Sequence, residues 1–179
     1  MRYDNTGKVI GQFGNCTKYF LSRDGKGVAF YSDSVLVITI DGKTVVTRNV
    51  GMSSVKEAKF SEDSKLLAIL SNTKLEVISL ADGALVWVYR LDDSSFQFFN
   101  FDADSSFTYF ICGADNTVDK SEKRNTQGKV ILLNSSGRLL WQQNLAYRDW
   151  SVRYPEVKID LTSRVFSILT ADKLIFYSF

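Results

Sequence analysis

The sequence contains no histidine, a single proline and only two cysteines among its 179 residues. The absence of histidine removes the usual general base, the Ser-His and Cys-His nucleophile pairs, and the commonest transition-metal ligand. Most hydrolase chemistries are therefore disfavoured, and we expect a protein that is not an enzyme and holds no cofactor or metal. The scarcity of proline leaves the apolar runs free of residues that interrupt strand pairing.

The sequence also lacks cysteine motifs, a large excess of either charge and long apolar runs. Cys16 and Cys112 stand alone and match neither a zinc motif nor a disulfide framework, so we interpret both as small apolar side chains in a reducing, cytoplasmic interior. The 22 basic and 20 acidic residues give a net charge of +2 without a basic stripe, which disfavours nucleic acid as a partner. No apolar run reaches membrane-spanning length and no signal peptide is visible, so no membrane partner is expected.

What the sequence does contain is a repeat of about forty residues. Four apolar residues each open an acidic turn, at spacings of 39, 41 and 58 residues: Leu21, Phe60, Phe101 and Ile159. A glycine within a polar turn follows in three of the repeats, at Gly42, Gly83 and Gly137. Short β-branched or aromatic runs predict second strands at 28–31, 66–70, 107–111 and 165–169, and third strands at 35–40, 75–80, 130–133 and 174–177.

A period near forty residues with several short strands per unit is typical of a β-propeller blade. We therefore predict an all-β, β-propeller-type fold with about four blades of four-stranded antiparallel sheet. The chain is expected to form one domain over 1–179, with repeats at about 14–50, 51–93, 94–147, and 148–179 plus 1–13.

Three stretches of the sequence resemble two kinds of known propeller repeat. Phe60-Ser-Glu-Asp-Ser-Lys-Leu-Leu-Ala resembles the second-strand entry of WD-repeat propellers. Gly83-Ala-Leu-Val-Trp87 and Gly137-Arg-Leu-Leu-Trp141 resemble the Gly-to-Trp strand of pyrroloquinoline-quinone-type propeller repeats. No residue matches a quinone-contacting position, so no cofactor is carried over. We expect Trp87 and Trp141 to pack within the fold.

The two ends of the chain complement each other in this scheme. Residues 8–13 form a candidate fourth strand without its first three, and the last repeat has only three strands. This resembles the closure in which a propeller's amino-terminal strand completes its last blade and hides two unpaired edges. Three arrangements stay open: a tight four-bladed ring, an eight-bladed ring of two chains that exchange these strands, and an incomplete ring cut from a longer propeller.

Two expansions of the repeat mark a candidate site. The third repeat carries a polar insertion at 114–128, and the crossing into the fourth repeat at 146–156 is also long. Such loops open on one face of a propeller, and aromatic residues beside arginine are typical of protein interfaces. A long loop can equally be a solvent-exposed connection without a binding site, since added length costs little closure entropy. The candidate partner-binding residues of this raised patch are Tyr147, Arg148, Trp150, Arg153, Tyr154, Lys120 and Arg124.

We expect a non-catalytic interaction scaffold that binds a protein partner or a second copy of itself. One alternative is a small-ligand or carbohydrate-binding propeller, with or without hydrolytic activity, in which carboxylates line a central funnel. Another is a structural segment of a larger propeller with no site of its own. Asp102 and Asp104 superficially match a calcium loop, but Asp104 aligns with the turn residues Asp24 and Asp63, so we interpret it as a turn residue.

Overall fold

The computed structural model describes residues 2–3, 9–11, 16–32, 34–50, 55–116, 127–146, 156–160, 164–169 and 174–178. Every element within these ranges is a β-strand, and every strand pairing is antiparallel. The strands form one short hairpin and four sheets, which we number I to IV in chain order. The predicted all-β class with about four sheets is confirmed.

Sheets I and II each have four strands in sequence order. Sheet I contains β3 (Lys18–Leu21), β4 (Gly27–Ser32), β5 (Val35–Ile40) and β6 (Lys43–Asn49). Sheet II contains β7 (Glu57–Phe60), β8 (Leu66–Leu70), β9 (Lys74–Ser79) and β10 (Leu85–Arg90). The predicted second and third strands of both repeats are present.

Sheet III repeats this order with longer strands: β11 (Phe96–Ala103), β12 (Tyr109–Asn116), β13 (Gln127–Asn134) and β14 (Leu139–Ala146). Sheet IV has three strands among the described residues: β15 (Glu156–Asp160), β16 (Val165–Leu169) and β17 (Leu174–Ser178). The amino-terminal hairpin pairs β1 (Arg2–Tyr3) with β2 (Val9–Gly11). Part of the predicted insertion at 114–128 therefore belongs to strands, because β12 and β13 extend into it from both sides.

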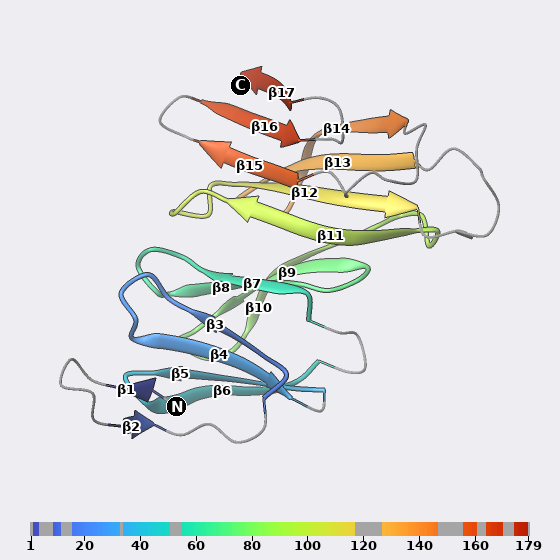
Figure 1. Cartoon of the computed structure of the whole chain (residues 1–179). Helices are drawn as coiled ribbons and strands as arrows, with labels where there is room; N and C mark the ends of the chain where they lie inside the picture. The colour runs from blue at the N-terminus through green and yellow to red at the C-terminus, as the bar shows by residue number, and fades with distance from the viewer. Residues whose placement is uncertain are drawn as a thin grey trace.

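The four sheets stack face against face in chain order, from sheet I at the bottom of Figure 1 to sheet IV at the top. Three apolar clusters fill the spaces between neighbouring sheets. Sheet II is buried on both faces, with Leu67 and Ile69 packed towards sheet I and Ala68 and Leu70 towards sheet III. This explains why β8 is apolar at every position, since a strand with both faces covered has no polar face to alternate with.

The arrangement is propeller-like, but the sheets do not close into a ring. The hairpin β1–β2 lies beside sheet I, at the opposite end of the stack from sheet IV. The strand predicted at 8–13 thus contributes β2 to a hairpin instead of a fourth strand to sheet IV. The one-chain closed ring is therefore not the arrangement in this structure.

A serine and an aspartate build each acidic turn of sheets I and II. In sheet II the Ser61 hydroxyl donates to Asp63 Oδ1 at 2.7 Å and accepts the Leu66 N–H at 3.0 Å. Sheet I repeats the pattern with Ser22 and Asp24. These local side-chain bonds satisfy backbone groups that the strands leave behind, which is why the motif recurs.

In sheet III the two residue types exchange positions. Asp104 accepts the Tyr109 N–H at 2.6 Å and the Ser106 hydroxyl, so it stands where Ser22 and Ser61 stand in the earlier turns. The backbone bonds agree, since the amide of Asp104 donates to Tyr109 O just as that of Ser61 donates to Leu66 O. The predicted alignment of Asp104 with Asp24 and Asp63 is therefore wrong by two residues.

The fourth strands, which follow the glycine turns, provide side chains that pack against the next sheet. In sheets I to III the pairing of the fourth strand skips one residue, and the residue after it points towards the following sheet. Trp87 lies over the turn at Gly137, where an added Cβ would come within 2.5 Å of the indole ring. Trp141 packs against Phe166 and Tyr177 of sheet IV, with ring centroids 5.3 and 5.1 Å away. The predicted packing role of both tryptophans is confirmed.

The two cysteines differ in their surroundings. Cys112 is buried in the cluster between sheets II and III, as predicted. Burial there raises the pKa of its thiol far above the ordinary value. Cys16 is exposed in the segment before β3, so its interpretation as an apolar core side chain is wrong.

Candidate functional site

The seven candidate partner-binding residues, at 120, 124, 147, 148, 150, 153 and 154, lie outside the described residues. The strands that bound the two expansions are described. Asn116 pairs with Phe96 at one end of sheet III, and Gln127 pairs with Ala146 at the same end. The strand ends that bound the two expansions therefore lie side by side at one end of sheet III.

A second candidate site lies where the first strands of successive sheets meet. We call it the first-strand polar row and define it as Lys18, Lys56, Glu57, Lys59 and Asp102. The ammonium of Lys18 in sheet I donates to the carbonyls of Val55 at 3.1 Å and Lys56 at 3.2 Å. The ammonium of Lys56 in turn donates to the carbonyl of Phe98 in β11. Each lysine thus binds the backbone of the next sheet.

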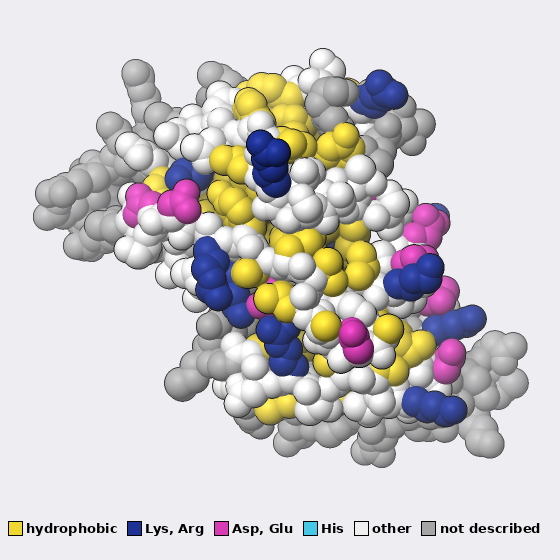
Figure 2. Space-filling view, turned by 180° about the vertical axis from the view of Figure 1, so that it is seen from behind, with side chains coloured by type: hydrophobic (Ala, Val, Ile, Leu, Met, Phe, Trp, Pro, Cys, Tyr) yellow, Lys and Arg dark blue, Asp and Glu magenta, His cyan; other side chains and the backbone are white. Residues whose placement is uncertain are grey.

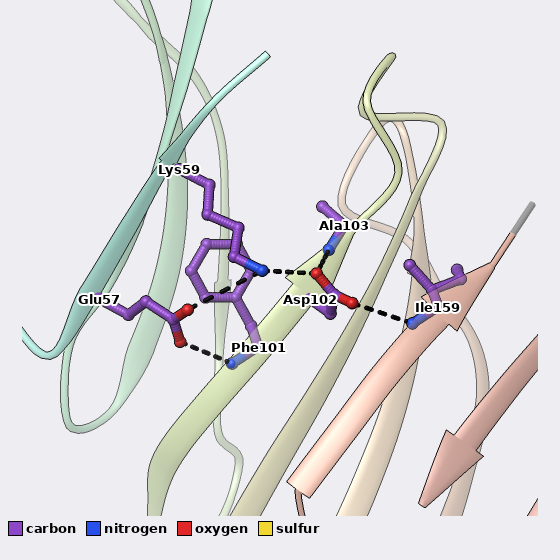
Figure 3. Close-up of polar contacts among 6 residues, drawn as sticks. All are labelled: Glu57, Lys59, Phe101, Asp102, Ala103 and Ile159. Carbon is purple, nitrogen blue, oxygen red and sulfur yellow. Dashed lines mark hydrogen bonds and ion pairs between the residues drawn. The ribbon is translucent and has the colours of Figure 1, made fainter. Parts of the chain in front are cut away.

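Three charged side chains continue the row from sheet II across sheet III to sheet IV (Figure 3). The Lys59 ammonium lies 2.5 Å from Asp102 Oδ1 and 3.9 Å from Glu57 Oε1. Glu57 Oε2 accepts the Phe101 N–H at 3.2 Å, and Asp102 Oδ2 accepts the Ile159 N–H at 3.0 Å. Both carboxylates therefore link the first strand of their own sheet to that of the next.

Burial changes the proton affinities of this row. Burial raises the pKa of the Glu57 carboxyl above its ordinary value, and the Lys59 charge and the Phe101 amide offset only part of this. Burial lowers the pKa of Lys56, and the charge of Lys18 lowers it further. A raised carboxyl pKa is also found in ligand sites. Here, however, the acids are already hydrogen-bonded to protein groups, an arrangement that supports the backbone.

Another buried charge joins sheets I and II. Glu76 of β9 is 2% exposed, lies 2.7 Å from the Lys74 ammonium, and lies 3.3 Å from the Arg48 guanidinium of β6. The strand predicted at 75–80 contains Glu76, but nothing in the sequence pattern indicates its partners in β9 and β6. Alternation within β7, where Glu57 and Lys59 flank Ala58, is the sequence signal that two polar side chains share one face.

The ten exposed large hydrophobic residues of the described chain fall into two groups. Five occupy two end faces of the stack, Tyr19 and Leu21 on sheet I and Leu169, Leu174 and Phe176 on sheet IV. The other five follow the glycine turns on the fourth strands, and we call them the fourth-strand row: Val45, Leu85, Val86, Leu139 and Leu140. Figure 2 shows one face of the molecule on which hydrophobic side chains run through successive sheets, with charged side chains on either side.

Comparison with protein-family models and with curated proteins finds no match to this chain. Among the residues with a described position, no group of three or more Cys, Asp or Glu side chains could hold a metal ion. Within the same part of the chain, no helix has the length and apolarity needed to cross a membrane.

Proposed function

We propose that this protein is a non-catalytic interaction scaffold, in which stacked sheets present a surface to a protein partner. The observation that carries the proposal is the fourth-strand row, whose members are 39 to 50% exposed. Isolated apolar residues on a surface need no explanation, whereas apolar residues repeated on successive elements are typical of interaction sites.

The geometry of the fourth strands explains why this row is exposed. The pairing skips Val45, Val86 and Leu140, one residue before Val46, Trp87 and Trp141. A bulge of this kind redirects the side chains next to it. The tryptophans pack between sheets while the skipped residues stay at the surface, so the repeat itself produces a row of apolar side chains.

The state of the acids supports a scaffold over a ligand-binding funnel. A ligand site requires polar groups that are free to meet the ligand. Glu57 and Asp102 each accept a backbone N–H of the neighbouring sheet, and Asp102 also binds Lys59. Removing these bonds for a ligand would leave backbone donors of two strands unsatisfied.

The raised patch at 114–128 and 146–156 is proposed as a second contact region, with Trp150, Tyr154 and Tyr147 as apolar anchors and Arg148 and Arg153 as polar contacts. A cytoplasmic location is proposed with it, because neither cysteine forms a disulfide in the structure.

The test is capture of a partner by immobilised chain, with variants at each surface. We expect the double variant Val86→Lys with Leu140→Lys to lose the captured protein at an unchanged melting temperature. The matched control is Ser105→Lys, at an exposed turn position outside the row. Trp150→Ala tests the raised patch in the same assay. Capture that survives both sets of substitutions would overturn the proposal, as would saturable binding of an oligosaccharide that depends on Glu57.

A further inference from the structure

The two end faces of the stack correspond, position by position, to faces that are buried inside it. The pairs Leu169–Leu174 in sheet IV and Leu70–Leu75 in sheet II have the same register relative to their turns. In sheet II these positions pack against sheet III, whereas in sheet IV they face away from the stack. Exposed positions and their buried equivalents are Leu169 (46%) and Leu70 (0%), Leu174 (55%) and Leu75 (0%), Phe176 (65%) and Val77 (1%).

Sheet I shows the complementary face at the other end. Tyr19 and Leu21 of β3 take the positions that Ala58 and Phe60 occupy in β7, where the pairing with the second strand runs Leu21 to Val28 and Phe60 to Leu67. Ala58 and Phe60 pack against sheet I. Tyr19 and Leu21 are 65 and 59% exposed, whereas Val28 and Thr39 on the same face are buried, at the end of the stack where the hairpin β1–β2 lies (Figure 1).

The composition of β17 matches a strand that is covered on both faces. Its sequence is Leu-Ile-Phe-Tyr-Ser, with apolar residues at four successive positions and no charge. A strand with one solvated face alternates apolar and polar residues. The apolar run in β17 therefore indicates that a further layer covers sheet IV.

We propose that a second copy of this chain provides that layer, with sheet IV of one copy stacked on sheet I of the other. Each of the three interfaces within the chain joins the same two kinds of face. Sheet IV exposes one such face, and the β3 side of sheet I exposes part of the other. A second copy continues the stack through the exposed β3 side of that face. When both contacts form, a two-fold axis relates the copies and closes eight sheets, a number within the usual range for propellers.

This pairing is independent of the fourth-strand row, so the two proposals fail separately. The first measurement is the mass of the purified chain by light scattering, over roughly a hundredfold range of concentration around micromolar. We expect twice the chain mass of 20.2 kDa. A mass of one chain throughout would overturn the proposal and assign the end faces to another polypeptide. A mass that keeps rising beyond two chains would overturn the closed pair.

The second measurement uses two variants with opposite faces blocked. Phe176→Lys blocks sheet IV and Tyr19→Lys blocks sheet I, and both side chains are 65% exposed, so the fold should tolerate the changes. The matched control is Val86→Lys. Val86 is 50% exposed and lies on neither end face, so this variant should keep the mass of two chains. Circular dichroism checks that each variant is folded.

Each blocked variant alone should have the mass of one chain. An equimolar mixture of the two should regain the mass of two chains, because the intact sheet IV of one variant meets the intact sheet I of the other. Only a contact between unlike faces predicts this recovery. Dimers of either variant alone, or a mixture that stays monomeric when the unsubstituted chain is dimeric, would refute the pairing.

Discussion

At the scale of single residues, polar side chains between the sheets contribute more to the stability of the fold than those at the surface do. Asp102 is the clearest case, since it accepts both the Lys59 ammonium and the Ile159 N–H. We expect Asp102→Ala to reduce the free energy of unfolding by about 1–3 kcal/mol, because a part-buried donor and a part-buried ammonium lose their acceptor. Urea unfolding measures this loss.

The exposed pair Arg23 and Glu62, 3.2 Å apart, is the control for that substitution. Arg23→Ala should change stability by less than about 0.5 kcal/mol, since exposed ion pairs contribute little. Equal effects of the two substitutions would show that the first-strand polar row does not hold the sheets together.

Glu57 gives stability an unusual pH dependence. Its pKa is raised by burial in the folded chain, so the folded state holds this proton more tightly than the unfolded state does. Raising the pH from the ordinary carboxyl value of 4.5 through the higher folded-state pKa therefore costs the native chain stability at this position. Glu57→Gln cannot titrate, and its amide oxygen can still accept the Phe101 N–H.

We expect the stability of the Glu57→Gln variant, relative to the unsubstituted chain, to improve as the pH rises through that window. Urea unfolding at a series of pH values upward from the ordinary carboxyl value of 4.5 measures the trend. A difference that stays constant with pH would contradict the raised pKa.

At the scale of elements, the sequence predicts which segments form strands better than it predicts where each strand begins. The strands at 35–40, 66–70 and 165–169 are found with the predicted bounds. β12 begins at Tyr109 instead of 107, because Phe107 adopts a φ of 57° in the turn. An aromatic residue in a left-handed turn position is uncommon, so strand propensity alone assigns it to the strand.

Docking of sheet II on the glycine turn of sheet III can be tested with one methyl group. Gly137→Ala introduces a Cβ both at a φ of +75° and 2.5 Å from the Trp87 ring, which already packs edge-on against Phe110. Gly42→Ala is the matched control, with a φ of +79° and no neighbour within 4 Å.

We expect Gly42→Ala to cost about 1–2 kcal/mol from backbone strain alone. Gly137→Ala should cost about 1–3 kcal/mol more, because the indole ring must move out of a packed site. Urea unfolding of both variants measures the difference, and tryptophan fluorescence reports the displaced ring. Equal losses of stability would mean that Trp87 does not depend on this turn.

At the scale of the whole molecule, the sequence predicts the stacked sheets but not what joins them. Periodicity shows which residues of a strand share a face, yet the partner of each side chain depends on the register between separate sheets. The contact of Lys59 with Asp102 joins residues 43 positions apart in different sheets, so no local pattern contains it. The sequence also does not show that sheet IV has an exposed end face. An apolar strand such as β17 is expected to be buried, whether the layer that covers it belongs to the same chain or to another.

Sheet IV should therefore be the least protected layer of an isolated chain. Its middle strand β16 is hydrogen-bonded on both sides, as β8 is, but one face of sheet IV is open while sheet II is covered on both. Amide exchange depends on local opening, which apolar packing opposes. At low concentration we expect β16 and β17 to exchange faster than β8 and β9 by mass spectrometry. If a second copy covers sheet IV, this difference in exchange rate becomes smaller as the concentration rises. In the Phe176→Lys variant the difference should stay the same at every concentration.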